Sequence, residues 1–451
     1  MKFFGKHIRS IYFLGIGGIG MSALARYFHR KGWQVSGYDR SASVITEGLA
    51  EEGVKIFYVM DESHLDEQDM VVYTPAIPTQ ALEYRAAVQR NIPMYKRAEV
   101  LGEISKAYQT LAVAGTHGKT TTSSMLAHVL EVIGGDPTAF LGGVANHLQG
   151  NFRLGASPWM VTEADEFDRS FLTLFPKLGL ITSLDPDHLD IYGSAEVMAE
   201  GYLAFGKQCE ALLVQADLPD TDWGKPVKSY GLDEGVYQAN NLRFEGLTTV
   251  FDFQSPKGQL KDLRLHMPGH HNVSNMVGAL ALAMEAGFGM EKFAEAVSTF
   301  AGIYRRFQVQ EDGDNISYID DYAHHPTEIA AAIRTARACF PERQLVVVFQ
   351  PHLYSRTRDF AAGFSEELSK ADVSILLPIY PAREEPIPGV SSSMLLEGME
   401  QAGKQLVEKN ALLAALQASI QPPTVLLSLG AGDIDREVAG LKTFVQTLNE
   451  S

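Results

Sequence analysis

The sequence predicts an α/β protein with three domains. Apolar strand patterns alternate with helical patterns along most of the chain, and two of the strand-to-helix transitions pass through glycine-rich turns. A length of 451 residues also suits about three cores, at roughly 150 residues per domain. Because strands joined through helices pair in parallel, we expect ligands to bind at the carboxyl ends of the strands.

Three domain ranges follow from these patterns. Residues 1–108 begin as a Rossmann-like unit, with a strand, a glycine turn, a helix and a second strand within residues 11–39. Residues 109–301 open with LAVAGTHGKTTTSSMLAHVLEVIG, which predicts a central α/β domain of the P-loop ATPase type. Residues 302–451 carry the apolar strands LVVVFQ, VSILLPI and TVLLSLG between helical segments, which predicts a second Rossmann-like domain.

Composition excludes several classes of protein. Hydrophobic residues at 45% and charged residues at 21% are typical of a folded globular chain. A net charge of −17 argues against a general nucleic-acid binder. Cys209 and Cys339 form no paired motif, which favours a reducing compartment. The apolar run 11–25 holds four glycines and continues into an amphipathic helix, so we expect a cytoplasmic protein without signal peptide or membrane span.

The first glycine-rich turn follows the first predicted strand. Gly15, Gly17 and Gly20 complete a GxGxxG pattern that includes Gly18, and Asp39 ends the next strand at the spacing of a ribose contact. Taken alone, this pattern predicts dinucleotide binding. The glycines and the helix N-terminus would bind any pyrophosphate, so a UDP-sugar fits equally well.

The second glycine-rich turn resembles a Walker A loop that opens a helix, although Val113 stands where the full pattern has glycine. The predicted ATP-binding residues of this loop are Gly115, Thr116, His117, Gly118, Lys119, Thr120 and Thr121. The Lys119 ammonium can bind the β and γ phosphates, and the Thr120 hydroxyl can ligate Mg²⁺. A chance GKT on a solvated loop is disfavoured by the strand before it and the helix after it.

Eight segments in order resemble the Mur ligase family: GIGGIGMS, GTHGKTTT, EADEFDRSF, DPDHLDIY, HHNVSN, YRRFQ, DDYAHHPTEI and FQPHLYSRTRDF. The last two resemble its alanine-adding branch. The resemblance implies ATP-dependent ligation of L-alanine to the carboxylate of UDP-N-acetylmuramate, through an acyl phosphate, in peptidoglycan precursor synthesis. It also implies that the first domain binds the UDP-sugar.

The resemblance implies two Mg²⁺ ions. Glu163, at the end of the apolar WMVTE, would join Thr120 as a ligand of one ion, and His188 in DPDHLD would bind the second. The alternatives are an ordinary solvated carboxylate for Glu163 and a structural histidine for His188. Some family members carry a carbamylated lysine beyond this histidine, but this chain has no lysine between Lys177 and Lys207.

Further ATP contacts follow from the same resemblance. Asn272 in HHNVSN would read adenine, Arg306 in RRF would reach the ATP phosphates, and Asp321 would contact the ribose. For Asn272, a helix N-cap remains an equal alternative. An arginine pair is more often a solvated surface feature, so the assignment of Arg306 depends on the resemblance.

The amino acid would bind in the third domain. Tyr322, His324, His352 and Arg356 form the predicted alanine site, where an arginine can clamp the carboxylate and a neutral histidine can take a proton from the ammonium. Some family members have a second arginine where this chain has Leu353. His325 is expected to be a packing or helix-capping residue before Pro326. The predicted catalytic residues are Lys119, Glu163, His188, His324 and Arg356.

Two other classes of function remain open. An NAD-dependent oxidoreductase would use the GxGxxG turn and Asp39, but it has no use for GTHGKT or the metal positions. A catalytically silent sensor of UDP-sugar and ATP would keep the fold without the reaction. As partners we expect the two substrates and neither nucleic acid nor membrane, with the chain a monomer or a weak dimer.

Overall fold

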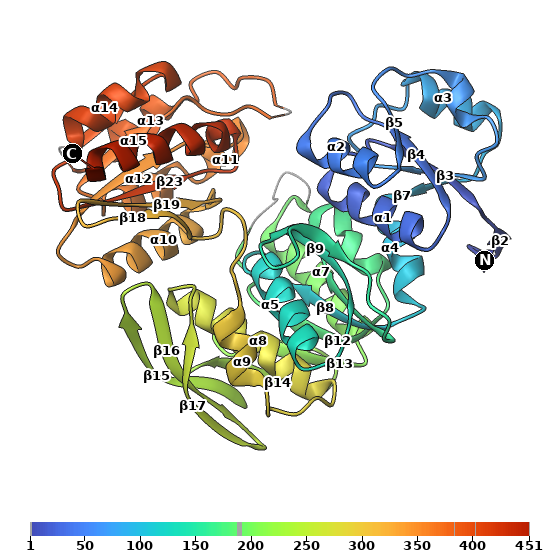
Figure 1. Ribbon diagram of the computed structural model, residues 1–451, viewed down its shortest axis with the longest axis horizontal. Helices are drawn as coiled ribbons and strands as arrows, with labels where there is room; N and C mark the ends of the chain where they lie inside the picture. Colours follow the sequence, from blue (N-terminus) through green and yellow to red (C-terminus); the bar gives the residue numbers. More distant parts are fainter. Residues whose placement is uncertain (1, 187–191, 383, 402, 451) are drawn as a thin grey trace. The chain divides into compact units, whose positions relative to one another are not determined.

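The computed structural model describes residues 2–186, 192–382, 384–401 and 403–450 (Figure 1). Within them lie three large sheets, one in each of the predicted ranges, and a two-stranded hairpin of β1 (Lys2–Phe3) and β2 (Lys6–His7). The predicted α/β fold with three sheet-and-helix parts is therefore confirmed. The boundaries near residues 108 and 301 stay predictions.

The first sheet has five parallel strands in the order β5-β4-β3-β6-β7, which is the Rossmann order. Its strands are β3 (Ser10–Leu14), β4 (Gln34–Tyr38), β5 (Lys55–Phe57), β6 (Met70–Tyr73) and β7 (Met94–Lys96). Its helices are α1 (Ile19–Arg30), α2 (Val44–Glu51), η1 (Glu62–Leu65), α3 (Leu82–Gln89) and α4 (Arg97–Ser105). The carboxyl ends of β3, β4 and β7 thus carry the glycine turn, Asp39 and Arg97.

This sheet is buried on both faces. Along β3, Ile11 and Phe13 belong to one apolar cluster, while Tyr12 and Leu14 belong to another. That alternation is expected for a strand covered by helices on both sides. The cluster of Ile11 and Phe13 continues into the central part of the chain, where it includes Phe140.

The central sheet has ten strands in the order β10-β9-β11-β8-β12-β13-β14-β15-β16-β17. Its strands are β8 (Gln109–Ala114), β9 (Thr138–Ala145), β10 (Gly150–Arg153), β11 (Trp159–Glu163), β12 (Pro176–Ile181), β13 (Ala211–Gln215), β14 (Lys228–Leu232), β15 (Tyr237–Glu245), β16 (Thr248–Ser255) and β17 (Gly258–Leu265). Its helices are α5 (Lys119–Val132), η2 (Phe167–Thr173), α7 (Ala195–Gln208), α8 (His270–Glu285) and α9 (Phe293–Thr299). Strand β8 pairs in parallel with β11 and β12, so their carboxyl ends meet at one edge.

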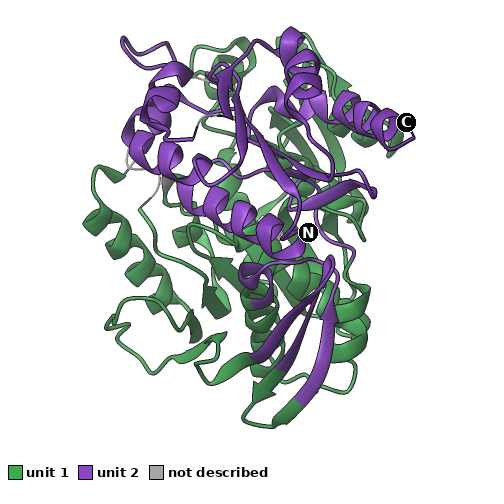
Figure 2. Cartoon of the chain, turned by 90° about the vertical axis from the view of Figure 1, so that its left-hand side faces the viewer, with its two compact units in different colours: residues 1–239, 253–259, 274–300 green, residues 240–252, 260–273, 301–451 purple. Residues whose placement is uncertain are grey.

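Two compact units divide the chain (Figure 2). The first unit comprises residues 1–239, 253–259 and 274–300, and the second comprises residues 240–252, 260–273 and 301–451. The first unit therefore holds the glycine turn and the Walker-like loop together. Residues 301–451, with the predicted alanine site, belong to the second unit.

The third sheet has six strands in the order β18-β19-β23-β20-β21-β22, all parallel except β18 against β19. Its strands are β18 (Gln308–Asp312), β19 (Ile316–Asp321), β20 (Gln344–Phe349), β21 (Val373–Leu376), β22 (Gly403–Leu406) and β23 (Thr424–Leu429). Its helices are α10 (Pro326–Cys339), α11 (Tyr354–Asp359), α12 (Ala361–Leu368), α13 (Ser392–Gly398), η3 (Lys409–Ala411), α14 (Leu412–Ser419), η4 (Asp433–Glu437) and α15 (Val438–Glu450). Alternate residues of β20 enter two apolar clusters, one including side chains of α10 and the other side chains of α15.

Among the described residues, no helix is long and apolar enough to cross a membrane.

We predict that Gly102→Ala destabilises the protein. Gly102 is buried on α4, and a Cβ there would lie 2.3 Å from the carbonyl oxygen of Thr173. Such overpacking against backbone costs about 1–3 kcal/mol. Gly440→Ala is the matched control, because Gly440 is exposed on α15 with nothing within 4 Å of a Cβ, and alanine there adds roughly 0.5–1 kcal/mol. Urea unfolding of both variants measures the difference, and equal stabilities would contradict the prediction.

Candidate active site

The Walker-like loop links β8 to α5 in a shape that requires glycine at two positions. Gly115 has φ +131° and Gly118 has φ +81°, both outside the range of ordinary L residues. A Cβ on Gly115 would lie 2.0 Å from the Thr182 hydroxyl oxygen, and one on Gly118 would lie 2.7 Å from Oδ1 of Asn275. The loop backbone is therefore held against two neighbouring segments.

Lys119 begins α5 and lies almost buried at the base of the loop. Its ammonium donates to the Gly115 carbonyl at 2.7 Å and pairs with the Glu166 carboxylate at 2.8 Å. Burial alone would lower the pKa of Lys119, but the carboxylates of Glu166, Asp165 and Glu163 outweigh this and hold its pKa above the usual value. The ammonium thus stays charged, as phosphate binding requires. Burial raises the pKa of Glu166 to about 7 despite this ion pair.

Thr120 and Glu163 meet at the same edge. The Thr120 hydroxyl donates to Oε2 of Glu163 at 2.8 Å, across the paired strands β8 and β11. The absence of a side chain at Gly142 leaves space for the Glu163 carboxylate, because a Cβ there would lie 2.0 Å from Oε2 of Glu163. A hydroxyl and a carboxylate in contact are the oxygen ligands that Mg²⁺ prefers, so these two residues fit the predicted ion. Their placement beside Lys119 suits an ion shared with phosphate oxygens.

His188, the ligand predicted for the second ion, lies outside the described residues. Among the described residues, no group of three or more His, Cys, Asp or Glu side chains is arranged to hold a metal. The ligand set of a second ion therefore stays a prediction.

The other loop residues are held by the segment that follows β12. Thr116 and Ser183 share a hydrogen bond of 2.9 Å between their hydroxyls, and the His117 N–H donates to the Ser183 hydroxyl at 2.7 Å. The His117 ring lies 3.5 Å from the Asp185 carboxylate. Thr121 is buried in the first turn of α5.

The glycine turn after β3 is braced by Asp39. The Gly17 N–H donates to Oδ2 of Asp39 at 2.7 Å, so this carboxylate organises the turn. Gly15 has φ +85°, and Gly18 is the residue before the first turn of α1. A Cβ on Gly20 would lie 2.9 Å from Cδ of Arg97. The turn and α1 can therefore present backbone N–H groups to a pyrophosphate.

Asn272 lies inside α8, where it is buried. Its Nδ2 donates to the Pro268 carbonyl at 2.7 Å, so the alternative of a helix N-cap is wrong. The N-cap position falls before the helix begins at His270, and Asn272 is in its first turn. Adenine recognition by Asn272 stays a prediction.

The two arginines of RRF have different environments. Arg305 is buried, with its Nε donating to Oδ2 of Asp320 at 2.8 Å. Arg306 is more exposed, and its guanidinium lies 5.1 Å from the ring centre of Tyr322. Arg306 is thus the one of the pair that can reach a ligand. Asp321 accepts N–H groups from Phe307 and Ala323 at 2.7 Å, and burial raises its pKa to about 6.

The predicted alanine-binding residues gather at the carboxyl edge of the third sheet. The rings of Tyr322 and His324 lie 5.2 Å apart, and those of His324 and His352 lie 6.2 Å apart. Arg356 is buried on α11, and its positive charge, secondary to burial, helps to lower the pKa of His324 to about 4. His324 is therefore neutral near pH 7, which is the form that can accept a proton. Glu328 accepts the backbone N–H of His324 at 3.0 Å, and its carboxylate lies 3.3 Å from Nδ1 of the ring.

His325 caps α10, with its side chain accepting the Thr327 N–H, and Pro326 occupies the first turn. The predicted capping role is confirmed. Leu353 is buried with φ +70°, a conformation that a non-glycine residue adopts only when its surroundings enforce it.

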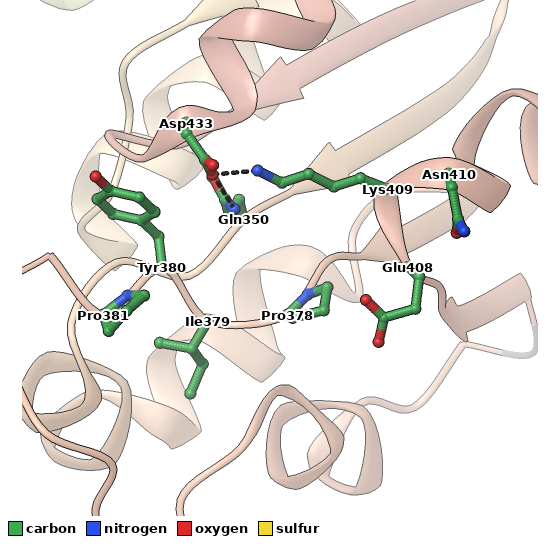
Figure 3. Close-up of a pocket in the computed structure, with 9 residues that line it drawn as sticks. All are labelled: Gln350, Pro378, Ile379, Tyr380, Pro381, Glu408, Lys409, Asn410 and Asp433. Carbon is green, nitrogen blue, oxygen red and sulfur yellow. Dashed lines mark hydrogen bonds and ion pairs between the residues drawn. The ribbon is translucent and has the colours of Figure 1, made fainter.

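A cavity of about 520 Å³ lies at the same edge of the third sheet. Figure 3 shows its lining, in which Asp433 accepts hydrogen bonds from Lys409 and from Gln350. Tyr380 borders this cavity and stacks on His352 with ring centres 5.8 Å apart. His352 therefore adjoins this cavity through Tyr380, while Tyr322, His324 and Arg356 are not among its lining residues.

Four residues at these sites were not singled out from the sequence: Glu166, Gly142, Asn275 and Arg97. Glu166 could have been found as the second glutamate of EADE, and Asn275 as the second asparagine of HHNVSN. No local pattern marks Gly142 or Arg97, because their positions matter only once β9 and α4 are folded.

Comparison with known proteins gives one consistent result. Family models match three stretches: "Mur ligase family, catalytic domain" at residues 10–109, "Mur ligase middle domain" at 113–283, and "Mur ligase, glutamate ligase domain" at 305–432. A protein of Flavobacterium johnsoniae named UDP-N-acetylmuramate--L-alanine ligase is 44% identical over 99% of both chains. One of the same name from Porphyromonas gingivalis is 43% identical over 98% of this chain and 100% of its own.

Solved structures agree. The UDP-N-acetylmuramate-alanine ligase of Thermotoga maritima has a TM-score of 0.82 at 29% identity, covering 98% of this chain and 100% of its own. A murein peptide ligase of Psychrobacter arcticus has a TM-score of 0.67 at 22% identity over 98% of both chains, which is a likeness of fold alone.

We predict that His324 makes the protein less stable as the pH falls. Its pKa near 4 in the fold lies below about 6.5 in the unfolded chain, so between these values the unfolded state binds the proton more readily. Stability from the neutral ring is complete above pH 6.5 and is lost toward pH 4. At pH 5 the loss is about 2 kcal/mol.

Urea unfolding at pH 7.5 and pH 5 checks this. His324→Gln should lose less stability between the two pH values than the wild type, whereas the exposed control His7→Gln should lose as much. An unchanged pH dependence in His324→Gln would show that the ring is not held neutral by the fold.

Proposed function

Because the chain belongs to the Mur ligase family, we propose that it joins L-alanine to the carboxylate of UDP-N-acetylmuramate in an ATP-dependent reaction of peptidoglycan precursor synthesis. Relatives that carry this activity in their names match it over 98–99% of its length. The observation that carries the proposal is the Walker-like loop, where Lys119 and the Thr120–Glu163 contact lie together at the start of α5.

The chain's residues around this loop suit phosphoryl transfer. ATP with Mg²⁺ supplies the phosphoryl group that turns the substrate carboxylate into an acyl phosphate with a good leaving group. Lys119, kept charged by neighbouring carboxylates, binds the transferring phosphate, and Thr120 with Glu163 holds one ion. We place a second ion at His188. Asn272, Arg306 and Asp321 complete the nucleotide contacts.

The glycine turn of the first sheet is proposed to bind the UDP-sugar. Asp39 organises the turn through the Gly17 N–H, which leaves the first turn of α1 for the diphosphate. A cavity of about 260 Å³ runs from Ile19 and Gly20 on α1 to Glu163 and Asp165 after β11. It leads from the diphosphate position to the metal position, which is the direction in which the muramate carboxylate has to point.

The alanine residues act in the second step. The amine attacks the acyl carbon, the C–N bond forms, and phosphate leaves. Arg356 is proposed to bind the alanine carboxylate, and the neutral His324 to take a proton from the ammonium. Tyr322 and His352 line the site through their ring contacts with His324.

The oxidoreductase alternative has little support here. Asp39 accepts the Gly17 N–H, and the Walker-like loop, Lys119 and Glu163 have no part in hydride transfer. The silent-sensor alternative differs from the proposal only in turnover, so a rate measurement separates the two.

We predict that wild-type protein releases phosphate from ATP only when UDP-N-acetylmuramate and L-alanine are both present, and that Lys119→Ala reduces this rate at least about 100-fold. The lysine's charge is lost from the transferring phosphate, whereas the sugar site is built from other residues. Calorimetry should therefore find the affinity of the variant for UDP-N-acetylmuramate nearly unchanged.

The exposed Lys257→Ala is the control and should behave as the wild type. Loss of sugar-nucleotide affinity in Lys119→Ala would mean that the sugar and phosphate sites are not separate. Phosphate release without alanine would oppose the ligase proposal itself.

We also predict that Arg356→Ala raises the Michaelis constant for alanine about 10- to 100-fold and that for ATP far less, because a bidentate ion pair to the alanine carboxylate is lost. Arg358→Ala, exposed on the same helix, is the matched control. Steady-state kinetics with each substrate varied in turn decides the matter. Equal increases for alanine and ATP would assign Arg356 a structural role.

A further inference from the structure

Arg97 lies where several features of the first unit meet. It is the first residue of α4 and directly follows β7, so it stands at the same carboxyl edge as the glycine turn and Asp39. Ligands of parallel sheets bind at this edge. Arg97 is partly buried, with its side chain lining the 260 Å³ cavity described above.

The guanidinium is packed against the beginning of α1. A Cβ on Gly20 would lie 2.9 Å from Cδ and 3.0 Å from Nη1 of Arg97. Gly20 is the second residue of α1, and only a residue without a side chain leaves this space. The third glycine of the GxGxxG pattern therefore admits an arginine side chain to the first turn of the helix.

Among the described residues, Arg97 takes part in no hydrogen bond or ion pair, although it lines a cavity that also contains the carboxylates of Glu163 and Asp165. Glu163 instead accepts the Thr120 hydroxyl, and Asp165 accepts the Phe167 N–H. A partly buried guanidinium in a cavity, with its five donors unused, is suited to an anionic ligand.

The UDP-sugar has two anionic groups that Arg97 could bind, the diphosphate and the muramate carboxylate. The contact with Gly20 places the guanidinium at the N-terminal turn of α1, whose N–H groups favour phosphate. The carboxylate has to reach the phosphoryl group held by Lys119 and Glu163, and Glu163 lines the cavity from the end of β11 rather than from α1. The position of Arg97 therefore favours the diphosphate.

We propose that Arg97 binds the diphosphate of the UDP-sugar as a bidentate partner, working with the N-terminus of α1. This inference depends on the proposed function, which supplies a UDP-linked substrate. It also gives Gly20 a second task, since its missing side chain is the opening through which Arg97 reaches the diphosphate.

Calorimetry with Arg97→Met, Arg97→Lys and the exposed control Arg85→Met tests this. The probes are UDP-N-acetylmuramate, UDP-N-acetylglucosamine, which lacks the muramate carboxylate, and ATP. Arg97→Met should weaken both UDP-sugars by the same factor, about 10- to 100-fold, because a charge-assisted pair is lost. Arg97→Lys should fall between, since it keeps the charge but not the planar fork. ATP affinity and the melting temperature should stay near wild type.

Kinetics adds a second readout. Arg97→Met should raise the Michaelis constant for UDP-N-acetylmuramate while leaving kcat at saturation and the Michaelis constant for ATP close to wild type. A loss confined to UDP-N-acetylmuramate would assign Arg97 to the carboxylate and overturn the inference, as would unchanged affinity for both sugars. If the wild type bound neither UDP-sugar, the proposed function would fail first, and this inference with it.

Discussion

The buried ion pair between Lys119 and Glu166 is the constraint around which the nucleotide loop is built. An ammonium removed from water needs a counter-charge and hydrogen-bond acceptors, and this one finds the Glu166 carboxylate and the Gly115 carbonyl. Glu166 itself is fully buried, and the ammonium of Lys119 opposes the rise in its pKa that burial causes. The pair fixes the segment after β11 against the start of α5, and with it the contact of Glu163 and Thr120.

The two glycine-rich turns are built alike but are held in place by different side chains. Each follows a parallel strand and opens a helix, and each depends on glycine where a side chain would strike a neighbour. At the first turn an acceptor, Asp39, draws the backbone N–H of Gly17 inward. At the second turn a lysine reaches back to the loop's own carbonyl. This difference agrees with the two proposed ligands. The first turn would bind the diphosphate of the UDP-sugar through the N-terminus of α1 and Arg97. The second turn would bind the ATP phosphates through Lys119 and Mg²⁺.

Much of this arrangement could be predicted from the sequence, because strand-turn-helix patterns are local. The three sheets, both glycine turns, the cap at His325 and the convergence of Tyr322, His324, His352 and Arg356 follow from patterns of a few residues. Arg97 and Gly142 did not, since their importance comes from segments far along the chain that approach in the fold. The N-cap alternative for Asn272 failed because the helix begins three residues earlier than an N-cap at Asn272 would require. The consecutive neighbouring strands β15, β16 and β17 were not singled out either, although Gly246 lies in the connection between the first two with φ +61°.

The apolar cluster shared by the first and central sheets bears on how the chain could be divided. Ile104 on α4 belongs to the same continuous core as Phe140, Phe171 and Phe13, and Gly102 leaves no gap against Thr173. If the chain were cut near residue 108, each of the two fragments would expose apolar surface, which promotes aggregation and slows refolding. Residues 1–108 therefore share their core with the central part of the first unit, and in hydrogen exchange their amides should open together with those of residues 109–239 as one cooperative block.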